Sequence, residues 1–199
     1  MKGAWFILLC FAVGVGVGYG HWWPAVWPLA DVTLYALYAL LFLVGVSIGS
    51  SQDALKLWSQ VNWKIVLVPL GIVVGSLAGA GLTAVFLPHI SFTEGLAVGA
   101  GFGYYSLSSV IIGQLRGDAL GVVALLSNIM REMMTLLLTP WLVRYFGRLA
   151  PIAAGGATAM DTTLPVITRF AGSHYALIAM FSGLVLTVLV PFLVTVILS

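Results

Sequence analysis

Charged residues are scarce in this sequence: they make up 7% of its 199 residues, against roughly 25% in a soluble domain. Several long stretches contain no Asp, Glu, Lys or Arg at all, namely 3–30, 32–52, 65–93, 95–115 and 170–199. About 20 consecutive apolar residues are enough to cross the bilayer core as an α-helix. The scarcity of charge therefore predicts an all-α polytopic membrane protein surrounded by the lipid bilayer.

Cysteine is nearly absent, and catalytic sequence patterns are missing. The single cysteine, Cys10, excludes an intramolecular disulfide. The net charge is only +2, and the basic residues form no stripe that would bind nucleic acid. No metal-ligand spacing, P-loop, zinc-protease or serine-hydrolase pattern occurs. We therefore expect no enzyme activity, no metal, no other cofactor and no nucleic-acid partner.

The apolar stretches divide a single domain, 1–199, into about seven membrane-crossing segments. Five of them are expected to be ordinary helices, at about 3–20, 32–51, 65–87, 119–146 and 172–197. The other two, 95–113 and 150–168, contain too much Gly, Ser, Thr and Pro for a regular lipid-facing helix. We interpret these two as Gly-interrupted broken helices, which are tolerated in a membrane where they are buried in protein or line a cavity.

The distribution of basic residues predicts an orientation. If every segment crosses, the loops at 21–31 and 88–94 lie on one side and contain no Lys or Arg. Cytoplasmic loops carry an excess of these residues, so the N-terminus is expected in the cytoplasm and the C-terminus outside. Arg144 and Arg148 then fall on the wrong side. The residues that fit are Lys2, Lys56, Lys64, Arg116 and Arg169.

The two Gly-rich segments resemble each other. GAGFGYYSLSSVI (99–111) aligns with GGATAMDTTLPVI (155–167), with Tyr105 opposite Asp161 and Ser106 opposite Thr162. The helices that follow also match, which gives candidate repeat units 95–146 and 150–197. Repeats built on broken helices are typical of secondary transporters, whose solute sites lie at the interruptions. The alternative is that close helix packing favours small residues in both segments.

Two charged residues, Arg131 and Glu132, lie near the middle of the apolar helix at 119–146. An ion at the bilayer centre costs about 2.5–3.5 kcal/mol, so both are expected to face the bundle interior or a cavity. A structural ion pair or a bridge between helices is the alternative. Other polar residues fall on the same stripe of the helix, namely Ser127, Asn128, Thr135 and Thr139.

Asp161 lies in the second Gly-rich segment and is followed by Thr162 and Thr163. A carboxylate, hydroxyls and freed backbone carbonyls together are suited to binding a cation. The alternative is that Asp161 caps the N-terminus of a short helix that has Pro165 in its first turn. The first Gly-rich segment adds further hydroxyl groups, those of Tyr104, Tyr105, Ser106, Ser108 and Ser109.

Three motifs, GFGYYSLSS, ALLSNIMRE and GGATAMDTTLPVI, follow one another in this order. Together they resemble the bacterial lysine exporter LysO family, from about residue 41 to the end. The resemblance implies export of L-lysine and of its analogue thialysine, with intramembrane acids taking part at Glu132 and Asp161. Family chains are commonly longer at the N-terminus. This chain is therefore expected to act alone or as a homo-oligomer, or with a separate small membrane subunit.

We therefore predict a multi-pass protein of the bacterial inner membrane that exchanges L-lysine for protons as an antiporter. Glu132 and Asp161 are expected to bind ammonium groups or protons, and Arg131 or a half-helix N-terminus the substrate carboxylate. The alternative is a membrane subunit of a larger transporter or channel assembly. The predicted substrate- and proton-binding residues are Glu132, Asp161, Arg131, Asn128, Tyr105, Ser106, Ser108, Thr162 and Thr163.

Overall fold

The computed structural model describes residues 63–199 continuously, together with a few helical residues between 13 and 46. The chain divides into two compact units, Met1–Ala39 and Leu40–Ser199, and the fold below is that of residues 63–199 in the second unit. The helices expected at 3–20 and 32–51 lie for the most part outside the described residues, as do Lys2 and Lys56.

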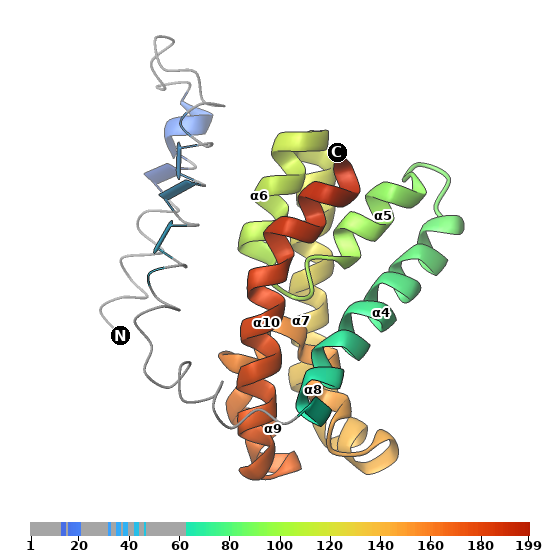
Figure 1. Ribbon diagram of the computed structural model, residues 1–199. Coiled ribbons are helices and arrows are strands. Elements are labelled where there is room, and N and C mark those ends of the chain that lie inside the picture. The colour runs from blue at the N-terminus through green and yellow to red at the C-terminus, as the bar shows by residue number, and fades with distance from the viewer. Residues whose placement is uncertain are drawn as a thin grey trace. The chain divides into compact units, whose positions relative to one another are not determined.

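Within residues 63–199 the regular structure is entirely helical (Figure 1). Three helices are long and apolar enough to cross a membrane, over Ile65–Val85, Asp118–Phe146 and His174–Leu198. This agrees with the all-helical membrane protein expected from the composition. The elements are α4 (Trp63–Val85), α5 (Phe92–Gly99), α6 (Tyr105–Arg116), α7 (Asp118–Phe146), α8 (Ala150–Gly155), the 3-10 helix η1 (Gly156–Met160), α9 (Leu164–Ala171) and α10 (His174–Leu198).

Helices α5 and α6 form a hairpin that enters and leaves at one end of the bundle. This is the end where α4 stops, drawn uppermost in Figure 1 and called the upper end here. Helix α5 runs back along α4, because Gly95 lies against Ala84 and Gly99 against Ala80. Helix α6 then returns to the upper end, where the Arg116 Nη2 donates a hydrogen bond to the Leu198 carbonyl at 2.9 Å.

Helices α8 and α9 form a second hairpin, which enters from the opposite, lower end. Helix α7 descends to this end, and α8 rises from it until the Ala154 carbonyl meets the Arg131 side chain in the middle of α7. Helix α9 turns back, and α10 then rises through the whole bundle. Gly183 of α10 packs against Met160 at mid-height, and Leu198 lies at the upper end.

The segments 95–113 and 150–168, expected to cross in one direction, thus turn back on themselves in the structure. The first reversal uses positive φ angles of 46° at Phe102 and 94° at Gly103, and the second has 63° at Gly156. Glycine permits such angles at little cost. A broken helix and a hairpin draw on the same Gly-rich composition, so composition alone does not separate them.

The tips of the two hairpins touch each other through their backbones. The Ala157 N–H donates a hydrogen bond to the Phe102 carbonyl at 2.8 Å. A Cβ on Gly156 would overlap that same carbonyl, and a Cβ on Gly103 would lie 2.9 Å from the Gly155 carbonyl. The contact therefore depends on glycine at both tips, and it brings together the two segments that resemble each other in sequence.

Candidate functional site

A cavity of about 190 Å³ lies beside the meeting point of the two hairpin tips. Four elements of the fold contribute to its wall. Because drug-sized ligands occupy pockets of about 300–1,000 Å³, this cavity suits a smaller solute. Its lining consists of Gly103, Tyr104, Tyr105 and Ser106 from the first tip, Ala157, Thr158, Met160, Asp161 and Thr162 from the second, Glu132 from α7 and Thr187 from α10.

Both predicted acids line this cavity. Glu132 comes from the middle of α7 and makes no hydrogen bond or ion pair with the described residues. The Asp161 carboxylate accepts hydrogen bonds from the Thr162 backbone N–H at 2.5 Å and the Thr162 hydroxyl at 3.3 Å. Neither carboxylate has a basic partner within residues 63–199. The cavity thus has two acidic groups on its wall and no cation among the residues that line it.

Asp161 does not cap the helix that follows it. The N-cap position of α9 belongs to Thr163, and no side chain there accepts a hydrogen bond from the helix N-terminus. Instead the Thr163 hydroxyl donates to the Thr158 carbonyl at 3.0 Å and is fully buried. The alternative role of Asp161 as a helix cap is therefore wrong, and its exposed carboxylate is bonded to Thr162 beside the cavity.

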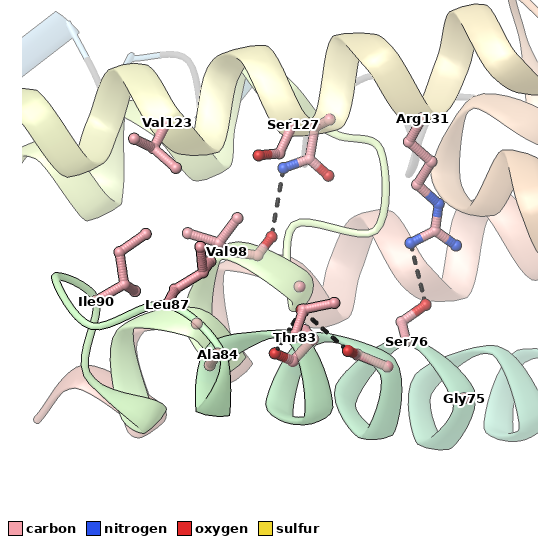
Figure 2. Close-up of a pocket in the computed structure, with 15 residues that line it drawn as sticks. Gly75, Ser76, Thr83, Ala84, Leu87, Ile90, Val98, Val123, Ser127 and Arg131 are labelled. Carbon is pink, nitrogen blue, oxygen red and sulfur yellow. Dashed lines mark hydrogen bonds between the residues drawn. The ribbon is translucent and has the colours of Figure 1, made fainter.

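Five of the predicted site residues meet at the cavity, and four do not. Tyr105, Ser106 and Thr162 join the two acids on its wall. Ser108 and Thr163 are buried, and their hydroxyls are used in hydrogen bonds to backbone carbonyls. The remaining two, Asn128 and Arg131, line a different groove of about 480 Å³ between α4, α5 and α7 (Figure 2).

Arg131 attaches the second hairpin to α4 and α7. Its Nε donates to the Ala154 carbonyl at 2.7 Å, and its Nη2 to the Ala153 carbonyl at 2.9 Å. Its Nη1 donates to the Ser76 hydroxyl at 3.0 Å, as Figure 2 shows. The two carbonyls belong to the last turn of α8, where the helix end carries partial negative charge. This end compensates the guanidinium, so the fold explains Arg131 without a substrate.

Asn128 holds the first hairpin tip in the same manner, one helical turn before Arg131. Its Oδ1 accepts the Gly103 backbone N–H at 2.7 Å, and its Nδ2 donates to the Ala124 carbonyl at 2.8 Å. A weaker bond of 3.4 Å joins the same Nδ2 to the Val98 carbonyl. Helix α7 thus positions both tips from one face and presents Glu132 to the cavity from another.

Three polar residues of the cavity lie outside the predicted set of binding residues, and of these the sequence singled out only Tyr104, for its hydroxyl. Tyr104 and Thr158 come from the two tips, and Thr187 comes from the middle of α10. Thr187 is 3% exposed, and its hydroxyl has no hydrogen-bond partner. A single threonine in an apolar membrane helix carries no signal of its own in the sequence, because such residues usually bond to their own helix.

Comparisons with known proteins agree with one another. A relative named "Lysine exporter LysO" from Escherichia coli (strain K12) is 35% identical over 164 residues, which cover 82% of this chain and 54% of the relative. A "Putative lysine exporter" from Haemophilus influenzae is 35% identical over 166 residues, covering 80% of each. This chain therefore spans about half the length of the Escherichia coli relative.

No solved structure matches this chain. The sequence model of the family described as "Lysine exporter LysO" matches residues 8–198, nearly the whole length. Because that match and two relatives at 35% identity agree, the chain belongs to the lysine exporter LysO family.

Proposed function

We propose that this chain exports L-lysine across the inner membrane and binds it in the cavity between the hairpin tips. The observation that carries the proposal is the convergence of Glu132 and Asp161 on a small cavity with no basic partner within residues 63–199. Unpaired acids at membrane depth are costly and mark substrate or ion pathways. The relatives are named as lysine exporters, which fits this chemistry.

Lysine at neutral pH carries two ammonium groups and one carboxylate. The two acids of the cavity offer one negative charge to each ammonium group. The substrate carboxylate needs donors instead, and the N-terminus of α6 supplies them. Tyr105 and Ser106 open this helix, line the cavity and have no side-chain cap on their backbone N–H groups. A helix N-terminus carries partial positive charge and binds anions.

In the proposed topology the described residues cross the membrane three times, in α4, α7 and α10. The two hairpins enter from opposite ends, and each is followed by one long helix. This twofold pattern supports an inverted repeat of units 95–146 and 150–197, as in other transporters. The tip of each hairpin forms part of the cavity wall. Movement of one hairpin at a time would open the site to one side.

With two hairpins in place of two crossing segments, the basic residues are distributed differently between the two sides of the membrane. Helices α7 and α9 both end at the lower end. This end therefore contains Arg144, Arg148 and Arg169. By the positive-inside rule this end is cytoplasmic, and the C-terminus lies outside. Arg144 and Arg148, which contradicted the rule when every segment crossed, now follow it. Arg116 becomes the exception, and its charge is engaged by the carbonyl of Leu198.

The same two acids would allow lysine to be exchanged for protons. When lysine leaves, Glu132 and Asp161 lose the positive charges that balanced them. A proton is the smallest cation that can replace them. Uptake of protons from the outer side, followed by their release inside when lysine binds again, would couple export to proton entry.

The test is efflux of labelled lysine from vesicles that contain the purified chain. Glu132→Gln and Asp161→Asn remove one charge each and keep the side-chain shape, so both should lose most of the efflux. Asp118→Asn is the matched control, because Asp118 is exposed at the upper end and does not line the cavity. Undiminished efflux in both cavity variants would exclude these acids as binding groups.

A second candidate function is a membrane subunit of a larger assembly. The observation that favours it is the coverage of only 54% of the Escherichia coli relative. Reconstitution of this chain alone separates the two candidates. Saturable lysine efflux from such vesicles supports an autonomous exporter, and lysine binding without efflux supports a subunit that needs a partner.

A further inference from the structure

Thr187 lines the cavity, and its hydroxyl is buried in the protein without a hydrogen-bond partner among the described residues. The residue is 3% exposed, and its Oγ1 accepts and donates no hydrogen bond within the described residues. We propose that this hydroxyl is a substrate ligand that accepts a hydrogen bond from an ammonium group of the bound diamino acid. The inference rests on the proposed function of the cavity and names a further residue that binds the substrate.

Most other buried hydroxyls within residues 63–199 have a hydrogen-bond partner, and Ser182 is the exception. A buried donor or acceptor that is left unsatisfied costs free energy, so folded proteins rarely retain one without a reason. Threonines on membrane helices normally bond to a carbonyl one turn earlier. Within residues 63–199 this holds for Thr135, which bonds to Arg131, and for Thr139, which bonds to Thr135.

The hydroxyls of Thr158 in η1 and of Thr163 also have hydrogen-bond partners. Thr158 donates to the Gly155 carbonyl at 3.0 Å, and Thr163 donates to the Thr158 carbonyl at the same distance. Thr187 differs from these four threonines, because it lies within α10 and yet its hydroxyl makes no such bond. Its immediate surroundings on α10 are apolar, with Leu186 and Val190 fully buried.

The chemistry of an ammonium group explains what the hydroxyl would do. An ammonium has three N–H donors, and each needs an acceptor when the group leaves water. The carboxylates of Glu132 and Asp161 satisfy some of them. A neutral hydroxyl from a further element of the wall supplies another acceptor without adding charge. Thr187 is contributed by α10, whereas the acids come from α7 and the second tip.

The chain contains a matched control for this residue. Ser182 lies on the same helix, is fully buried, and has a hydroxyl that also lacks a partner. It is not among the residues that line the cavity. Removing its hydroxyl therefore tests the effect of losing an unpaired buried group from α10, separately from any contact with the substrate.

The experiment measures lysine binding to the purified full chain in detergent by isothermal titration calorimetry. Thr187→Val keeps the shape and removes the hydroxyl, and Thr187→Ser keeps the hydroxyl. Because a hydrogen bond to a charged group is lost, the valine variant should bind lysine about tenfold more weakly or worse. Thr187→Ser and Ser182→Ala should stay within about threefold of the original chain.

A second readout separates binding from folding. Without lysine, Thr187→Val should melt at the same temperature as the original chain or higher, because it removes an unsatisfied buried group. Unchanged lysine affinity in this variant would overturn the role of Thr187 and leave the proposed function standing. Equal weakening in Ser182→Ala would overturn it too. If the original chain binds no lysine, the proposed function fails and this inference fails with it.

Discussion

Replacing Arg131 with methionine tests whether this residue holds the fold together or binds the substrate. The variant keeps a long unbranched side chain and removes the three hydrogen bonds to Ala153, Ala154 and Ser76. Hydrogen bonds from a charged group contribute about 1.5–3 kcal/mol each, hence about 4.5–9 kcal/mol for three. Removing the charge recovers about 2.5–3.5 kcal/mol of its insertion cost. The expected net destabilisation is about 1–6.5 kcal/mol.

The assay is thermal unfolding of the purified chain in detergent, followed by tryptophan fluorescence and combined with lysine binding. Arg131→Met should lower the melting temperature markedly. Ser76→Ala removes one of the three bonds and should lower it by a smaller amount. Arg131→Lys should fall between them, because one ammonium does not reproduce the planar fork that reaches two carbonyls and a hydroxyl.

If Arg131→Met unfolds at the original temperature and no longer binds lysine, the guanidinium acts on the substrate and not on the hairpin. That result would restore the role predicted from the sequence, in which Arg131 binds the substrate carboxylate. A melting temperature lowered equally with and without lysine supports the structural role.

Two further predictions concern the hairpin tips and pH. Gly156→Ala places a Cβ against the Phe102 carbonyl of the first tip at a φ of 63°, so lysine efflux from vesicles should be lost. The control Gly147→Ala, at a φ of 89° with open space around it, should keep most of the efflux. Greater loss of efflux in Gly147→Ala than in Gly156→Ala would contradict the contact between the tips. The Ser91 backbone N–H lowers the pKa of Glu94 at the exposed start of α5. This contribution to stability is complete above the ordinary pKa of 4.5 and is lost as the pH falls through the lowered value, so Glu94→Gln should flatten the acid side of a plot of melting temperature against pH.

The membrane class and the two acids were accessible from the sequence. Long apolar runs leave few structures other than membrane helices, because every backbone polar group must be satisfied inside the bilayer. In such a chain an acid at mid-helix is too costly to face lipid, so Glu132 was expected to face a cavity. Asp161 followed from the same argument, applied to a Gly-rich segment with a matching partner at 99–111.

The roles of Arg131 and Asn128 were not accessible in this way. Both lie on the polar stripe of α7 that also contains Glu132, and a helical projection does not say which neighbour covers which edge of a stripe. In the structure, hairpin tips cover Asn128 and Arg131 and satisfy them with backbone groups. Because every residue has a backbone carbonyl, the sequence does not indicate which carbonyl will bind a given side chain.

The membrane environment of this protein and the residue types at its centre can be read from the sequence, since both follow from the cost of placing charge in lipid. Tertiary structure alone decided that the two Gly-rich segments turn back as hairpins and meet tip to tip. It also decided that Thr187, from the predominantly apolar helix α10, lines the cavity. Chain reversal and the choice of neighbours depend on contacts between distant segments, and local composition does not encode them.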